Sequence, residues 1–202
     1  MVITYYGASC FKVQSGETVI AFNPPSKESN FKSPRFAADI VLVSSNNKDY
    51  NGGENIPGKS DGGKPFLADG KGEYEVGGIY IKGTGSNGLN NTIYSLTVED
   101  ISICHLGAMS TEFDPKIKED IGEVDILFAP IGGGDLMDPQ KAASVAAHLE
   151  AKVVIPMHYE EAQLRQFIKE FGSGEVVPSD KLTIKRKDLA EKKGEIVVLR
   201  SN

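Results

Sequence analysis

Apolar positions in the first half of the chain recur in short runs with the two-residue period of β-strands. The turn at residues 15–17 and further Gly, Asn and Pro-rich segments separate these runs, which predict strands at residues 2–6, 10–13, 18–22, 66–68, 72–76, 79–82, 92–98 and 101–105. So many short strands indicate one sheet packed on another.

One stretch, residues 39–53, combines a strand with a polar loop. Residues 40–43 form an unbroken apolar run, and the polar segment after it ends at Gly52 and Gly53. Such a run predicts a buried strand that delivers a loop at its carboxyl end. Loops in that position often carry binding or catalytic residues.

The second half of the chain changes to a helical period. Asp138 followed by Pro139 is typical of a helix start, and the apolar spacing after it predicts a helix that reaches about residue 150. A buried strand is predicted at residues 153–156, and a second amphipathic helix at 160–171 stops at Gly172. Residues 196–199 predict a last strand.

Several motifs together resemble the metallo-β-lactamase superfamily, in the branch that includes ascorbate-phosphate lactonase-like and other metal-dependent hydrolases. The motifs run from residue 2 to residue 199: Gly7-Ala-Ser-Cys-Phe11, Ser44-Ser-Asn-Asn-Lys-Asp-Tyr50, His105-Leu-Gly-Ala108, residues 124–133 and residues 153–159. The resemblance implies an α/β (α+β) fold, the four-layer αββα sandwich. It also implies a single domain over residues 1–202.

The same resemblance places the family's metal ligands on residues that are mostly poor zinc donors. The first metal's ligands correspond to Ser45, Asn47 and a histidine that residues 83–90 lack. The ligands of the second correspond to Asp49, Tyr50, Ala108 and His158. Only Asp49 and His158 remain as donors, whereas zinc needs three or four His, Cys or carboxylate ligands. The predicted cofactor is therefore none, and the alternative is a weakly bound divalent metal.

The three histidines are expected to have different roles. His148 lies within a predicted helix as a surface residue, and His105 shares a strand face with Ile101 and Ile103 as a structural histidine. His158 ends a buried strand and is expected in the cleft. The Gly132–Gly134 loop could hold an anion with its amides, but a tight turn is the simpler interpretation.

Composition excludes several partners. The formal net charge of -6 argues against a nucleic-acid surface, and no apolar run near 20 residues or leader suggests a membrane. Cys10 and Cys104 are expected to be reduced and buried, and the protein to be cytoplasmic. A small molecule or another protein is the expected partner, and a homo-oligomer is possible.

Three functional hypotheses follow. The first is a non-catalytic binding or regulatory module, a pseudoenzyme that has lost most of its zinc ligands. The second is a metal-dependent hydrolase of altered design, which acts on lactones or phosphoesters with Asp49 and His158. The third uses Ser44 or Ser45 as a nucleophile with His158 as the base.

Overall fold

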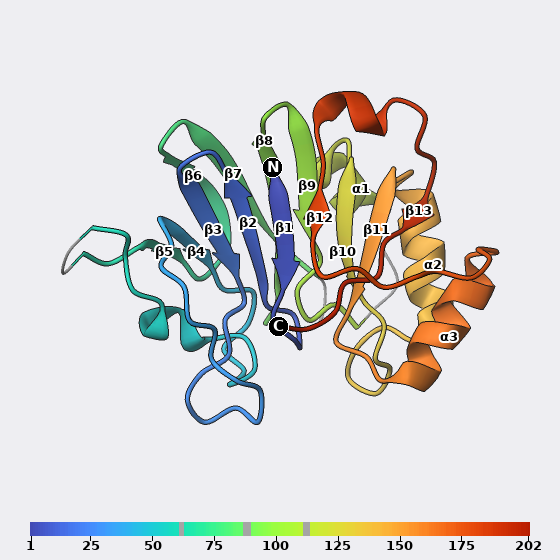
Figure 1. The fold of residues 1–202 in the computed structure, drawn as a ribbon, viewed down its shortest axis with the longest axis horizontal. Helices are drawn as coiled ribbons and strands as arrows, with labels where there is room; N and C mark the ends of the chain where they lie inside the picture. Colours follow the sequence, from blue (N-terminus) through green and yellow to red (C-terminus); the bar gives the residue numbers. More distant parts are fainter. Residues whose placement is uncertain (61–62, 87–89, 111–113) are drawn as a thin grey trace.

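Two mixed β-sheets pack face to face in this protein (Figure 1). The computed structural model describes residues 1–60, 63–86, 90–110 and 114–202, and within those ranges the strands divide into six in one sheet and seven in the other.

The six-stranded sheet has the order β12-β1-β2-β3-β4-β5. Its strands are β1 (Val2–Tyr5), β2 (Phe11–Ser15), β3 (Thr18–Phe22), β4 (Ile40–Leu42), β5 (Phe66–Ala68) and β12 (Leu182–Thr183). The pairs from β12 to β3 are antiparallel, and β3, β4 and β5 run parallel. The carboxyl end of β4 therefore lies among parallel neighbours, where it delivers the polar loop.

The seven-stranded sheet has the order β13-β11-β10-β9-β8-β7-β6. Its strands are β6 (Gly72–Val76), β7 (Ile79–Gly85), β8 (Thr92–Val98), β9 (Ile101–His105), β10 (Ile126–Pro130), β11 (Val153–Met157) and β13 (Glu195–Ile196). Strands β9, β10, β11 and β13 are parallel, while β6 to β9 alternate in direction. The long apolar runs of β10 and β11 fit strands that are covered on both faces.

Aromatic side chains fill the space between the sheets. Phe11, Phe22 and Phe128 are fully buried there, and the rings of Phe11 and Phe128 lie 4.3 Å apart. Burying each such ring contributes roughly 2–3 kcal/mol relative to leaving it in water. This layer is the main core of the fold.

Helices cover the outer face of the seven-stranded sheet. They are α1 (Pro115–Ile121), α2 (Pro139–His148) and α3 (Glu161–Glu170), with α2 and α3 side by side in Figure 1. Ala142 and Ala146 of α2 pack in one buried cluster with Leu127 and Val154 of the sheet. The side chain of Asp138 caps α2 by accepting from the Lys141 amide at 2.8 Å, as the sequence predicted.

The outer face of the six-stranded sheet has a different cover. Val41 and Val43 pack there with Ile56, which follows the 3₁₀ helix η1 (Gly52–Asn55). A Cβ on Gly53 would come within 3.2 Å of Val41, so η1 lies directly on the sheet. The α/β sandwich class is confirmed. In the described ranges, though, a 3₁₀ turn and loops form this outer layer where the resemblance implied a helix.

Further elements differ from the sequence prediction. Helix α1 was not predicted, although Asp114 caps it by accepting from the Lys116 amide at 2.9 Å, the same cap-then-proline pattern that revealed α2. The predicted strand at 196–199 is shorter, because Leu199 pairs with Ser179 instead of continuing β13. A second 3₁₀ helix, η2 (Arg186–Leu189), was also missed.

None of the helices in the described ranges has the length and apolar character to cross a membrane.

A buried carboxylate ties the amino-terminal side of β10 to its neighbours. Asp125 accepts from Lys152 Nζ at 2.7 Å, from Arg186 Nη1 at 2.5 Å and from the Ser102 amide at 2.9 Å. Burial alone would raise the pKa of Asp125, but the Lys152 and Ser102 hydrogen bonds and the two cationic charges lower it below its ordinary value.

Replacing this carboxylate should make the protein less stable at neutral pH. We expect Asp125→Asn to lower the free energy of unfolding by about 2 kcal/mol in urea titrations, because a charged acceptor is lost from three donors. The folded-state pKa of Asp125 is depressed. The stabilisation that Asp125 gives the fold is therefore present above its unfolded-state pKa and is lost as pH falls through its folded-state pKa. The free energies of unfolding of variant and parent should therefore become equal in acid.

Asp180→Asn is the matched control, since Asp180 is an exposed carboxylate whose oxygen lies 3.0 Å from Arg200. Its effect should stay below about 1 kcal/mol. Equal losses in the two variants would contradict a special role for Asp125.

Candidate functional site

A cleft of about 1890 Å³ opens at the carboxyl ends of the central strands. The segments after β1, β3, β4, β9, β10 and β11 and the last residues of the chain form its walls. All six residues that the sequence placed in a former metal site line it: Ser45, Asn47, Asp49, Tyr50, Ala108 and His158. Their proximity is therefore a property of the fold, whereas their role stays a prediction.

Hydrogen bonds to other segments fix the loop after β4. The Ser44 amide donates to Asn23 Oδ1 at 2.7 Å, and the Ser44 carbonyl accepts from the Thr92 amide at 2.7 Å. Further along, the amide of Tyr50 donates to the Asn47 carbonyl at 2.9 Å. These contacts turn the loop back over the strand ends and carry Asp49 and Tyr50 into the cleft.

Asp49 is half-buried and has a partner from outside its loop. Its Oδ1 accepts from the Ser29 hydroxyl at 2.6 Å, and its own amide donates to Asn47 Oδ1 at 3.0 Å. Ser29 lies 20 residues earlier, in a segment without regular structure, and no pattern in the sequence pointed to it.

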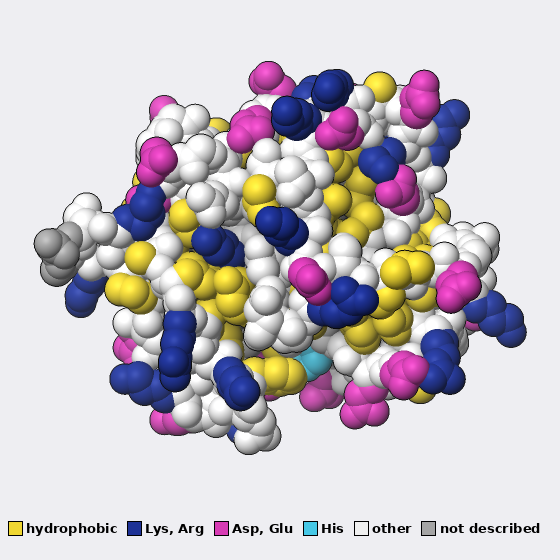
Figure 2. Space-filling view, in the orientation of Figure 1, with side chains coloured by type: hydrophobic (Ala, Val, Ile, Leu, Met, Phe, Trp, Pro, Cys, Tyr) yellow, Lys and Arg dark blue, Asp and Glu magenta, His cyan; other side chains and the backbone are white. Residues whose placement is uncertain are grey.

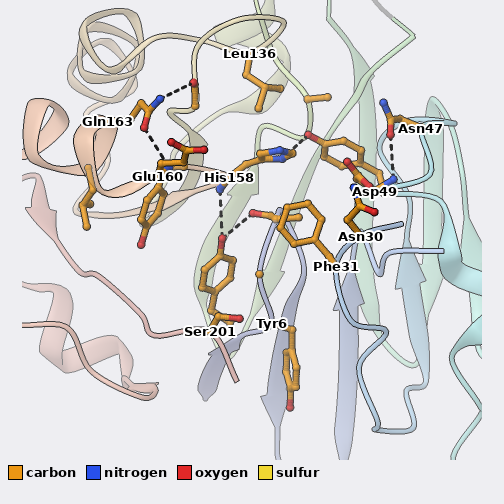
Figure 3. A pocket seen from close by; sticks show the side chains of 18 of the residues that line it. Tyr6, Asn30, Phe31, Asn47, Asp49, Leu136, His158, Glu160, Gln163 and Ser201 are labelled. Atoms are coloured by element: carbon orange, nitrogen blue, oxygen red, sulfur yellow. Dashed lines mark hydrogen bonds between the residues drawn. The ribbon is translucent and has the colours of Figure 1, made fainter. Parts of the chain in front are cut away.

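His158 follows β11 directly and lies at the centre of the cleft (Figure 3). Its amide donates to the Ala8 carbonyl at 2.7 Å, and its Nδ1 is 2.9 Å from the Tyr50 hydroxyl. The imidazole stacks on the ring of Tyr50 and meets Phe31 edge-on, with centroids 5.8 and 5.7 Å away. Burial lowers the pKa of His158, while the charge of Asp49 opposes that shift.

The backbone at His158 is constrained as well. Its φ of 51° is in the left-handed region, which costs a residue with a Cβ about 1 kcal/mol or more. The His158 carbonyl also approaches the Gly132 backbone so closely that a Cβ there would lie 2.4 Å away. Gly132 therefore makes room for this histidine. Beyond it, the Leu136 amide donates to the Gly133 carbonyl at 3.0 Å, so the Gly132–Gly134 loop contains a tight turn.

Tyr50 is the residue that the sequence resemblance aligns with the last histidine of the family's loop motif. It is 3% exposed, and burial raises the pKa of its phenol to about 12, although the Ser9 hydroxyl lowers it somewhat. The phenol therefore stays uncharged near neutral pH and shares a hydrogen bond with His158.

The other two histidines lie outside the cleft. His105 is fully buried, with Nε2 3.1 Å from the Ser9 carbonyl and Nδ1 accepting from the Gly107 amide at 3.1 Å. Desolvation lowers its pKa to about 3, so it is a neutral structural residue, as expected. His148 is exposed on the last turn of α2.

The donor set does not fit a tightly held zinc ion. Across the described ranges, no group of three or more His, Cys, Asp or Glu side chains is arranged to hold a metal. Asp49 and His158 supply two donors. Ala108 offers no side-chain donor, and its amide is held by Asn91 Oδ1 at 2.7 Å. Hydroxyl and amide oxygens such as those of Ser45 are poor zinc ligands.

The serine hypothesis finds no geometric support either. The Ser44 hydroxyl is buried and has no hydrogen-bond partner. The Nδ1 of His158 is within hydrogen-bonding distance of the Tyr50 hydroxyl. Within the described ranges, no hydrogen bond joins Ser44 or Ser45 to this imidazole. A nucleophilic hydroxyl and its general base normally lie within hydrogen-bonding distance of each other.

The electrostatics of the cleft can be tested by NMR titration of the histidine rings. We expect His158 to titrate below the ordinary histidine range, and Asp49→Asn to lower its pKa further, because the charge that favours the imidazolium is removed. His105 should show no titration above about pH 4, in keeping with its depressed pKa. An upward shift of the His158 midpoint in Asp49→Asn would contradict this account.

Comparison with known proteins agrees with the fold. Residues 2–158 match the model of the Beta-lactamase superfamily domain. A metal-dependent hydrolase of Listeria monocytogenes is 25% identical over 194 residues, which cover 79% of this chain and 85% of the relative. One from Lysinibacillus sphaericus is 28% identical over 193 residues, with the same coverage of both proteins.

A solved structure is similar over nearly the whole length. A Thermotoga maritima protein, assigned to the Zn-dependent hydrolases of the metallo-β-lactamase superfamily, superposes with a TM-score of 0.82 at 31% identity and 98% coverage of both chains. The names of these relatives favour the second functional hypothesis, a metal-dependent hydrolase, over the first. The matched model, the relatives and the sandwich architecture together establish that this chain belongs to the metallo-β-lactamase superfamily.

Proposed function

We propose that this protein binds a small molecule in the superfamily cleft without a tightly held catalytic zinc ion. The observation that carries the proposal is the donor set, in which only Asp49 and His158 remain and each already has a hydrogen-bond partner of its own. Two donors hold zinc poorly against water and competing ligands. The cleft itself is retained and has the mixed aromatic and polar lining of ligand sites.

The replacements are also mutually consistent. The position of the family's bridging carboxylate is Ala108, which leaves no unpaired charge where a metal would have sat. Tyr50 supplies a neutral hydroxyl to His158, and Ser29 supplies one to Asp49. A buried carboxylate without metal or partner would cost several kcal/mol. Hydrogen bonds thus take over the pairing that metal ions would otherwise provide.

A second candidate is a metal-dependent hydrolase of lactones or phosphoesters, in which Asp49 and His158 hold a divalent cation weakly. The names of the relatives support this candidate. It differs from the first in requiring metal-dependent turnover.

Elemental analysis separates the two candidates. The protein purified without chelator should contain far less than one equivalent of zinc after desalting, and added divalent metal should produce no hydrolysis of lactones or phosphodiesters above buffer background. A chelator-sensitive activity that disappears in His158→Ala would overturn the first candidate in favour of the second.

Restoring the missing ligands tests how the loop corresponds to the family motif. The quadruple variant Ser45→His, Asn47→His, Tyr50→His and Ala108→Asp should gain measurable zinc affinity in calorimetry, because six donors would then surround the cleft. The control is the same variant with His158→Ala, which should bind zinc more weakly by roughly ten-fold or more. A folded quadruple variant that binds no better than the parent would show that the loop was aligned wrongly.

A further inference from the structure

The charged side chains of the cleft carry an excess of carboxylates. They are Asp49, Asp135 and Glu160 on the acidic side and Lys32 and Arg200 on the basic side. Arg200 Nη1 donates to Asp180 at 3.0 Å, so the charge of Arg200 is already paired with a carboxylate that is not among the lining residues of the cleft. Lys32 alone then opposes three carboxylates. In Figure 2 a histidine is visible in the hollow, with acidic side chains beside it and Lys or Arg side chains also nearby.

Among the described residues that line the cleft, Lys32 and Arg200 are the only Lys or Arg side chains. The local field therefore comes mainly from carboxylates, which attract cations and repel anions.

Aromatic rings stand beside one of these carboxylates. The Phe31 amide donates to the Ser29 hydroxyl at 3.0 Å, and that hydroxyl donates to Asp49, so a single serine joins Phe31 to the carboxylate. The rings of Phe31 and Tyr50 both pack against His158. Figure 3 shows Phe31, Asp49 and His158 around the same opening. Phe31 is 37% exposed, so part of its ring is free to meet a ligand.

A carboxylate next to aromatic rings is the chemistry that recognises an organic ammonium group. The rings attract the cation through their quadrupoles, and the carboxylate adds a direct charge partner. Asp49 Oδ1 accepts from Ser29, and a carboxylate can accept further hydrogen bonds at its remaining lone pairs.

We propose that the cleft selects organic amines, with the ammonium group at Asp49 beside the exposed part of the Phe31 ring and the apolar part of the ligand along the other aromatic side chains that line the cleft. This inference rests on the proposed function, because it assigns a ligand class to the same metal-free cleft. The carboxylates would repel an anionic ligand of the same size.

Three probes that share a phenyl ring and differ in charge test this preference. They are 2-phenylethylamine, 2-phenylethanol and 3-phenylpropionate, each titrated by calorimetry into the 202-residue protein at neutral pH with EDTA present. The amine should bind at least about ten-fold more tightly than the alcohol, with the carboxylate weakest. Salt at about 0.5 M should reduce the advantage of the amine.

Two variants locate the preference in the cleft. Asp49→Asn, which keeps the size of the side chain, should remove most of the difference between amine and alcohol. Glu75→Gln removes one charge from an exposed position on β6 and should leave the difference unchanged. A thermal melt of each variant checks that the fold is intact.

Equal binding of the three probes, tighter binding of the carboxylate, or an amine preference that survives in Asp49→Asn would each overturn the inference. So would the absence of binding by all three at millimolar concentration. These outcomes are distinct from failure of the proposed function, which zinc content and metal-dependent hydrolysis report, whereas the probe titrations measure charge selectivity in chelated protein.

Discussion

The packing of the two sheets against each other near the cleft depends on one neutral histidine. His105, at the end of β9, contacts the Ser9 carbonyl of the first sheet's β1–β2 loop and accepts from the Gly107 amide on its own side. Its ring stacks on Phe22 of the first sheet, 5.0 Å away and nearly parallel. Because a charged imidazole could not remain in this apolar layer, the depressed pKa and the packing depend on each other. The neighbours of Ser9 and Gly107 line the cleft, so this contact also sets its shape.

Hydrogen bonds connect the cleft loops to one another. The pair between Tyr50 and His158 joins the loop after β4 to the end of β11, two segments from different sheets. Ser29 connects Asp49 to an irregular segment in a similar way. A metal ion would cross-link such loops through its ligands. The two hydrogen bonds therefore hold these segments together at the cleft, although each contributes only about 1 kcal/mol net.

The sequence revealed those features that depend on local pattern. Buried strands such as β4 and the capped start of α2 follow from periodicity and from Asp138, and the motif register brought Asp49 and His158 to one cleft. The hydrogen-bond partners of these two residues could not be predicted from the sequence. The bond from Ser29 to Asp49 depends on the path of an irregular loop, and the left-handed backbone of His158 depends on Gly132, which is far away in the sequence. Such contacts form only when the tertiary structure closes.

The aromatic lining of the cleft has a spectroscopic consequence. The chain has no tryptophan and seven tyrosines, of which Tyr5, Tyr6, Tyr50 and Tyr159 line the cleft. Tyrosine emission is therefore not masked by indole absorption. The phenol of Tyr50 shares a hydrogen bond with His158, so a ligand that alters this bond is expected to alter the emission of Tyr50. Intrinsic fluorescence excited in the tyrosine band thus reports on occupancy of this site without a label.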